Sequence, residues 1–517
     1  MNSLIRLSHA HLYLSGALAL ALAAGGCTPG PEYERPKTHA DVLQKFNEET
    51  KEGTANKGMS HWWESIGDPA IHRDVALLLR DNLDLKQARA RIKQAREQVK
   101  INAGMFAPMI SVGASRNRNF RPAEDFGTIF GSGSFSGGGG DVRIYDTSIE
   151  GTVSATWQLD LFGQTRTRVA ASEARFAAAE MDREALLHSL IAELVKNRIA
   201  LASLSEQLKL TRQIADNRQD VLDLVERRYE TGTRNVSVSD VHLARQSLAS
   251  VKSNIPDLEQ AIKQRTYAID VLLGQLPGTT RNDMNEIALT PPEREIPAGI
   301  PAHLLDRRPD LRSSELRLVA EYRDVGIAIS DLFPDLSLTG NIGLEDETTT
   351  DIFRSERMVG SLISQVSATL FEGGALRARI RYEEAQKEEM IAAYTKDVLA
   401  ALQEVETALV RERKIGQRLH EIDREVKSAK RRVQSNRQRY ERGIIPLTTY
   451  LDSELDLYDA RLGQIAGREA QWDARINLYL ALGGDWVNEL PAFDIPHYST
   501  AGTDQDMKTL NNKETKG

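Results

Sequence analysis

The segment IEGTVSATWQLDL, residues 149–161, alternates between apolar and polar side chains. Apart from Gly151, its odd-numbered positions are apolar, and its even-numbered positions carry glutamate, threonine, serine, glutamine or aspartate. A period of two predicts a β-strand whose two faces meet different surroundings. About ten residues is also the length that a tilted strand needs to cross a bilayer. A half-buried strand of a soluble sheet has the same pattern, so both interpretations stay open on this segment alone.

The alternating segment belongs to a unit that occurs twice in the 517-residue chain. Short landmarks recur in the same order in both halves, which indicates an internal duplication. They are 82–85 with 308–311, 106–108 with 332–334, 161–163 with 370–372, 228–232 with 439–443, and 273–274 with 482–483. The first copy is longer between Pro108 and Phe162, and we place its additional residues in a loop around the glycine-rich run 131–140.

Each copy is predicted to contain a first helix, two strands, a long helix and a shorter return helix. The strands are expected around 110–114, 149–161, 336–342 and 362–370. The helices are expected at 68–104, 163–230 and 237–273 in the first copy, and at 301–331, 373–441 and 447–482 in the second. The long segments lack proline, and at 1.5 Å per residue each spans roughly 100 Å. Apolar residues three and four positions apart along them predict a coiled-coil seam.

The N-terminus predicts export from the cytoplasm. Arg6 precedes an apolar run at 12–24, and two glycines lead to Cys27 and a proline-rich stretch. This pattern is typical of a secretion signal, and the single cysteine resembles the lipobox cysteine of bacterial lipoproteins, so we predict that Cys27 is acylated. The alternative is an ordinary signal peptide with an incidental cysteine. The predicted organisation is a signal peptide at 1–26, a lipid-anchored segment at 27–67, a first repeat at 68–274, a linker at 275–300, a second repeat at 301–495 and a disordered tail at 496–517.

Composition argues against several classes of function. The formal net charge of −8 provides no basic footprint, so we expect no nucleic-acid partner. One cysteine permits neither an internal disulfide nor a cysteine metal cluster. The histidines outside the signal peptide are not spaced as a helical zinc pair, and no acid, base and nucleophile stand together. We therefore predict a protein that is not an enzyme and has no cofactor.

The predicted strands impose a condition on assembly. Four strands cannot close a barrel, and an open sheet edge is not tolerated in lipid. Two chains would supply eight strands, which enclose an interior filled by side chains. If the strands span a membrane, a conducting pore therefore needs at least three chains, and the long helices would continue it as a tunnel.

Three motifs add a family resemblance. They are Cys27 with Pro31, Tyr33 and Pro36; Trp62 and Trp63 with Gly67, Asp68 and Pro69; and the segment LLDRRPDL at 304–311. In these features the chain resembles the outer-membrane efflux proteins, the TolC-like family, and in particular its lipoprotein branch. The resemblance implies an α+β fold and a homotrimer with a twelve-stranded β-barrel in the outer membrane of a Gram-negative bacterium. A helical barrel would continue it through the periplasm.

The same resemblance implies the function and the partners. Such channels are passive exits for drugs or toxic small molecules, and they dock with a periplasmic adaptor and an inner-membrane transporter of the RND type. Two alternatives stay open: a channel for type I protein secretion, and a lipid-anchored coiled-coil scaffold. A scaffold has no need for alternating strands of membrane length, and the acylation signal with the proline-rich leader favours the efflux branch.

In that family the periplasmic tip closes near the turns between long and short helices, which correspond to 228–240 and 439–452 here. The resemblance places Asp452 at the pore, with Thr448 one helical turn earlier on the same face. Three carboxylates near one axis would attract cations and resist closing unless they were protonated or bridged by an ion.

Three further residues are gate candidates by the same resemblance. Asp240 is the first-copy counterpart of the acid, and Tyr440 with Arg439 would pair across neighbouring helices in the closed state. For each of these gate residues, the alternative is a structural side chain, a solvated charge at a helix end or a helix cap, where aspartate is common.

Overall fold

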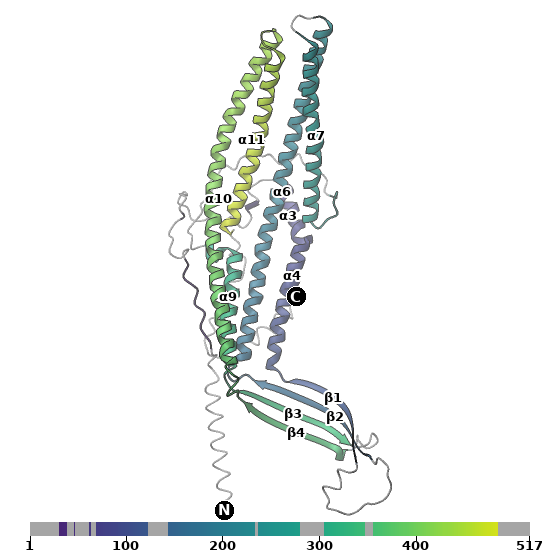
Figure 1. The fold of residues 1–517 in the computed structure, drawn as a ribbon, viewed down its shortest axis with the longest axis vertical. Coiled ribbons are helices and arrows are strands. Elements are labelled where there is room, and N and C mark those ends of the chain that lie inside the picture. The colour runs from purple at the N-terminus through teal and green to yellow at the C-terminus, as the bar shows by residue number, and fades with distance from the viewer. Residues whose placement is uncertain are drawn as a thin grey trace, which may run out of the picture.

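The computed structural model describes residues 30–38, 46, 62–63, 69–122, 143–232, 236–279, 304–346 and 355–483. These residues form an α+β fold in which two long helical hairpins stand on a four-stranded antiparallel sheet (Figure 1). Among the described residues, no helix combines the length and the apolar character that a membrane-crossing helix requires.

The order of elements is the same in both copies. The first copy contains α4 (Leu83–Ala103), β1 (Met109–Pro122), β2 (Arg143–Leu159), α6 (Gln164–Glu230) and α7 (Val238–Leu272). The second contains α9 (Pro309–Ser330), β3 (Asp335–Asp346), β4 (Met358–Ser367), α10 (Ala375–Glu441) and α11 (Leu447–Leu482). The long helices α6 and α10 have 67 residues each. The predicted long and return helices are therefore confirmed, with their ends displaced by one or two residues at most.

The first helix of each copy was predicted as one piece, and this prediction is wrong. A short helix precedes the break in each copy, α3 (Pro69–Asp81) in the first and α8 (Leu304–Arg307) in the second. The Asn82 side chain accepts a hydrogen bond from the Leu85 N–H at 2.9 Å, which caps α4. Arg308 takes the same position before α9. The duplicated landmark at 82–85 and 308–311 is thus a helix start.

The sheet places apolar and polar side chains on opposite faces. Its strand order is β1-β2-β3-β4, and β2 pairs with β3 to join the two copies. Ile110, Ala155, Gly340 and Leu362 stand opposite one another in a row across the four strands. Large members of this face are open to the surroundings, since Leu362 is 74% exposed and Val112 in the next row is 80% exposed. An exposed apolar sheet face of this kind suits a lipid environment rather than water.

The opposite face is polar and hollowed. A cavity of about 510 Å³ is lined mainly by small and polar residues of all four strands, among them Ser115, Thr152, Asn341 and Ser361. The sheet thus has a polar concave side, as expected of a segment of barrel wall around a wet lumen.

The additional residues of the first copy do not all lie in the loop where they were predicted. β1 and β2 have 14 and 17 residues, whereas β3 and β4 have 12 and 10. The additional residues therefore extend the strands as well as their connection. The run 131–140 lies outside the described residues.

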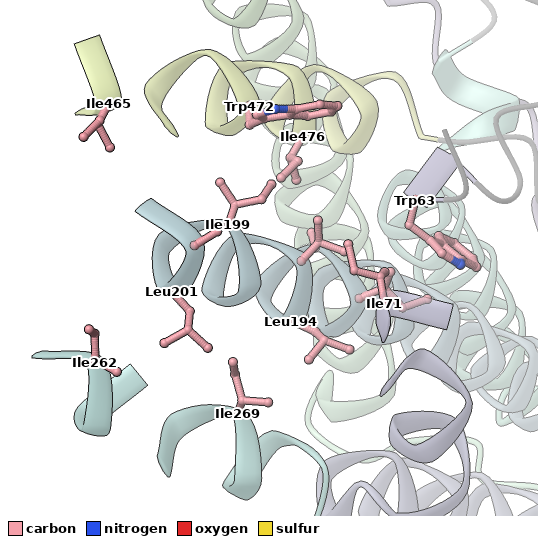
Figure 2. Packing of buried hydrophobic residues seen from close by; sticks show 14 of the residues in the cluster. Trp63, Ile71, Leu194, Ile199, Leu201, Ile262, Ile269, Ile465, Trp472 and Ile476 are labelled. Atoms are coloured by element: carbon pink, nitrogen blue, oxygen red, sulfur yellow. The ribbon is translucent and has the colours of Figure 1, made fainter. Parts of the chain in front are cut away.

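The main core lies where the helical hairpins meet. Figure 2 shows Leu194 and Ile199 of α6 among side chains that include Ile269 of α7 and Ile476 of α11. Because α6 contacts both its own return helix and that of the second copy, it is the element on which the two hairpins pack.

Candidate functional site

The turns between long and return helices lie at the end of the molecule opposite the sheet (Figure 1). α6 ends at Glu230 and α10 at Glu441, and a glycine follows each end. Gly232 and Gly443 have φ values of 66° and 72°, a left-handed conformation that favours glycine and ends a helix. The duplicated Arg-Tyr-Glu-x-Gly motif is therefore a helix end with its turn. It brings all the predicted gate residues to one end of the molecule.

Asp452 and Thr448 lie on the first turns of α11, and both side chains are exposed. They stand four positions apart, so they share a helix face. Leu451 and Ser453, on either side of Asp452, are buried. The Asp452 carboxylate therefore points away from the core. Its role at a pore stays a prediction.

Asp240 makes contacts that fit the helix-cap interpretation. Its carboxylate accepts hydrogen bonds from the backbone N–H and the hydroxyl of Ser237, both at 2.8 Å. The Asp240 N–H in turn donates to the Ser237 hydroxyl at 3.3 Å. The two residues form a capping box at the start of α7.

Tyr440 is buried against Tyr450 and an arginine of the first copy, and its pairing with Arg439 across neighbouring helices stays a prediction. Its ring stacks on that of Tyr450, with centroids 5.6 Å apart and planes 7° from parallel. The guanidinium that lies 5.5 Å from the Tyr440 ring centre belongs to Arg228 of the first copy. Arg228 also donates to the Glu441 carbonyl at 3.2 Å, while Arg439 is exposed. Burial raises the pKa of the Tyr440 hydroxyl.

A buried ion pair ties the two copies together below the turns. The Arg218 Nε of α6 lies 3.4 Å from the Glu454 Oε2 of α11, and both side chains are buried. Arg218 also donates to the Leu451 carbonyl at 3.2 Å. The Tyr450 hydroxyl donates to the other Glu454 oxygen at 2.6 Å. The first turns of α11, which carry Asp452, are therefore fixed to α6.

Burial shifts the pKa values of two side chains in this group. Desolvation lowers the pKa of Arg218, and desolvation with the Glu454 hydrogen bond raises the pKa of Tyr450. Sequence reasoning missed the group because Arg218 and Glu454 come together only in the folded chain. The i,i+4 spacing of Tyr450 and Glu454 was the one available signal.

The N-terminal leader is held along α9 by a second buried carboxylate. Glu315 accepts hydrogen bonds from Arg35 Nε and Nη2 at 2.7 Å each, and from the Tyr33 hydroxyl at 2.9 Å. Further toward the sheet, Gly30 lies so close to Gly326 that a Cβ on Gly30 would come within 2.7 Å of the Gly326 Cα. Followed back from Arg35 to Gly30, the leader therefore lies along α9 and approaches the strands. Cys27 lies outside the described residues.

Within the part of the chain that the structure describes, no three histidine, cysteine, aspartate or glutamate side chains gather as a metal site. The polar side chains that the structure describes at the tip include carboxylates, guanidinium groups and phenols.

Comparison with known proteins agrees with this architecture. The sequence profile of the family described as outer membrane efflux protein matches residues 75–275 and 300–484. The chain belongs to the outer membrane efflux protein family. It is an efflux channel subunit of the Gram-negative outer membrane, with its helical hairpins in the periplasm.

Relatives match this family member over nearly their full length. The pyoverdine export outer membrane protein OpmQ of Pseudomonas putida is 30% identical over 450 residues, which cover 85% of this chain and 92% of the relative. The toluene efflux pump outer membrane protein TtgC of Pseudomonas putida is 27% identical, covering 91% and 96%. The solved outer-membrane channel OprN superposes with a TM-score of 0.78 at 29% identity, covering 89% of this chain and all of the other.

We predict that Glu454→Ala strongly destabilises the tip. The substitution leaves the Arg218 guanidinium buried without its carboxylate, which costs about 3–5 kcal/mol for a buried pair. Hydrogen exchange of the α6 and α11 amides around Arg218 and Glu454, together with the thermal midpoint, measures the effect.

The matched control is Glu421→Ala, which removes an exposed carboxylate 2.9 Å from Arg424 and should cost about 0–1 kcal/mol. The double variant Arg218→Met with Glu454→Leu should regain most of the lost stability, because no charge is then left buried. Equal protection in Glu454→Ala and Glu421→Ala would contradict the role of the ion pair.

Proposed function

We propose that three copies of this chain assemble into the outer-membrane exit duct of a tripartite efflux pump. The observation that carries the proposal is the sheet, which has four strands, an exposed apolar face and β1 and β4 as its edges. Four strands are too few to close a barrel, and open edges are not tolerated in lipid. Three copies would supply twelve strands, enough for a wet lumen bounded by the polar concave face.

The proposed duct is a passive conduit and not an enzyme. Its proposed partners are a periplasmic adaptor and an RND-type inner-membrane transporter, which would supply the energy. The names of relatives favour small organic substrates, since they mention pyoverdine export, toluene efflux and antibiotic efflux. On this ground we propose drugs or toxic small molecules as the substrate class, rather than the proteins of a type I secretion system.

The proposed gate is the ring of three Asp452 carboxylates. Two observations support it: the exposed carboxylate lies at the free end of the hairpins, and the adjacent Leu451 carbonyl is held by buried Arg218. A fixed backbone keeps the carboxylates at a defined distance from the axis, where they attract cations and repel one another. Tyr440 and Tyr450 would pack behind the ring, and Asp240 would cap the neighbouring helix.

Cys27 is proposed as the site of lipid attachment. Gly30 packs against Gly326 near the end of α9, which leads into β3. Three residues of extended chain reach at most about 11 Å. The acyl chains on Cys27 would therefore enter the same leaflet that the strands begin to cross.

The first prediction from the proposed function concerns assembly. Protein extracted from outer membranes in mild detergent should have the native mass of three mature protomers, because only closure satisfies the backbone groups of β1 and β4. Native mass spectrometry or light scattering measures it. A monomer under these conditions would contradict the proposed channel.

A second prediction concerns the anchor. Cys27→Ser should abolish acylation, measured by labelling with a radioactive or clickable fatty acid. Trimers should persist, since strand pairing rather than the lipid closes the barrel. Acyl label on the Cys27→Ser protein would disprove the assignment.

A third prediction concerns the gate. Asp452→Ala should raise single-channel conductance in planar bilayers and weaken its dependence on cations, because the substitution removes three like charges near the axis. Asp223→Ala, which removes an exposed carboxylate from α6, is the control and should leave conductance unchanged. Identical traces for the two variants would remove Asp452 from the gate.

A further inference from the structure

The packing of α11 along α6 joins the two copies within one chain. Near the turns, buried Arg218 of α6 pairs with Glu454. Farther along the same seam, the Thr211 and Tyr458 hydroxyls lie 2.9 Å apart. Still farther, the Lys196 Nζ donates to the Asn477 amide oxygen at 2.6 Å. The seam is therefore continuous over much of the length of the hairpins.

The internal duplication relates this seam to a second pair of helices. α10 is the copy of α6, and α7 is the copy of α11. The equivalent of the α6–α11 seam is thus one between α10 and α7. In Figure 1 these two helices lie on opposite flanks of the hairpin pair. One chain cannot bring them together, but α7 of a neighbouring copy can lie against α10.

The free flank of α7 carries apolar side chains at the seam positions. Ile476 of α11 stands seven positions before Gly483, and it is fully buried in the cluster that contains Leu194 of α6. The residue seven positions before Gly274 is Tyr267, which is 44% exposed, and Val271 four positions later is 61% exposed. The position of Ile476 is thus covered in the second copy, whereas its first-copy equivalent Tyr267 and the nearby Val271 are exposed, which indicates a partner over α7.

At the tip of the seam, the duplication repeats the two residue types that make one specific contact. Within the chain, Arg228 lies over the Tyr440 ring. The duplicated motif supplies the same two residue types at the equivalent positions, Arg439 on α10 and Tyr229 on α6 beside the start of α7. Both side chains are exposed in the single chain, Tyr229 by 45%.

The buried ion pair of the seam is not repeated. Counted back from the motif glycines, the second-copy equivalent of Arg218 is Ala429. Counted back from the ends of the return helices, the first-copy equivalent of Glu454 is Arg245. Arg245 instead pairs with Glu226 of its own repeat at 2.7 Å. The arginine and the tyrosine are therefore the residue pair of the tip that the duplication retains.

We propose that Arg439 of one protomer packs over the Tyr229 ring of the next protomer, and so joins adjacent copies at the tip as Arg228 and Tyr440 join the two repeats. A cation within about 6 Å of an aromatic ring centre is attracted to the ring face. The inference rests on the proposed trimer, and it adds which surfaces of the tip meet: the α7 flank of one copy and the α10 flank of the other.

The test is thiol cross-linking in the full-length chain. The variant Tyr229→Cys with Arg439→Cys is treated in outer membranes with a short bismaleimide and run on a denaturing gel. We expect covalent dimers and trimers, because each bridge links two different chains. The parent protein, with Cys27 as its single cysteine, and each single variant should stay monomeric on the gel.

Two control pairs use the same reagent. Arg228→Cys with Tyr440→Cys should form a bridge within one chain and give no higher bands. Tyr229→Cys with Gln434→Cys moves the α10 thiol about 140° around the helix, at roughly 100° per residue, and should also stay monomeric. Equal dimer yield from the 434 and 439 pairs would overturn the proposed contact.

Native mass of the same samples separates this inference from the trimer proposal. A trimer in detergent without dimer bands for the Tyr229 and Arg439 pair overturns the contact and leaves the trimer intact. A parent protein that is monomeric overturns both. If only the double variant fails to assemble, a photoreactive benzoyl-phenylalanine at position 229 of the otherwise unchanged chain replaces it as the test. This probe should label the neighbour's peptide around Arg439. Labelling elsewhere overturns the contact.

Discussion

The open edges of a four-stranded sheet with an apolar face are the constraint on which the rest of the structure depends. Among the strands that the structure describes, β1 and β4 each present a row of backbone N–H and C=O groups without a neighbour on one side. In a bilayer such groups have no water to bond, and each unsatisfied group costs several kcal/mol. In lipid the sheet is therefore complete only when further strands pair with its edges, and the shape of the helical part must be compatible with the proposed closure by other copies.

The duplication makes the two parts compatible. Each copy supplies two strands and one hairpin of a 67-residue helix with its return helix. The sheet continues across the copies through the pairing of β2 with β3, and the helices continue through the packing of α11 on α6. The first copy therefore joins the second both in the sheet and in the helical part. The proposed ring that closes the barrel would then also bring α7 of one protomer to α10 of the next.

The features predicted correctly from the sequence are those that repeat over many residues. The return helices, predicted at 237–273 and 447–482, are found at 238–272 and 447–482. The break before α4 was missed because the apolar spacing continues through Asn82, although Pro309 at the start of α9 is a recognised helix-start signal. Arg218 and Glu454 were missed because neither has a local pattern, and only the tertiary fold brings them together. The predicted gate residues do share one end of the molecule, but which arginine faces Tyr440 depended on the packing of one repeat against the other.

The seam within the chain and the proposed seam between protomers differ in strength at the tip because they differ in burial. Inside a protomer, separating α11 from α6 would leave Arg218 and Glu454 without each other, and loss of one partner from a buried pair costs several kcal/mol. Between protomers the proposed contact is an arginine over a partly exposed tyrosine, worth about 0.5–1 kcal/mol. A trimer with the proposed contact would open at the tip along the seams between protomers before the hairpins within a protomer separate. The proposed acid ring would act in the same direction, because moving whole protomers apart relieves the repulsion among three Asp452 carboxylates.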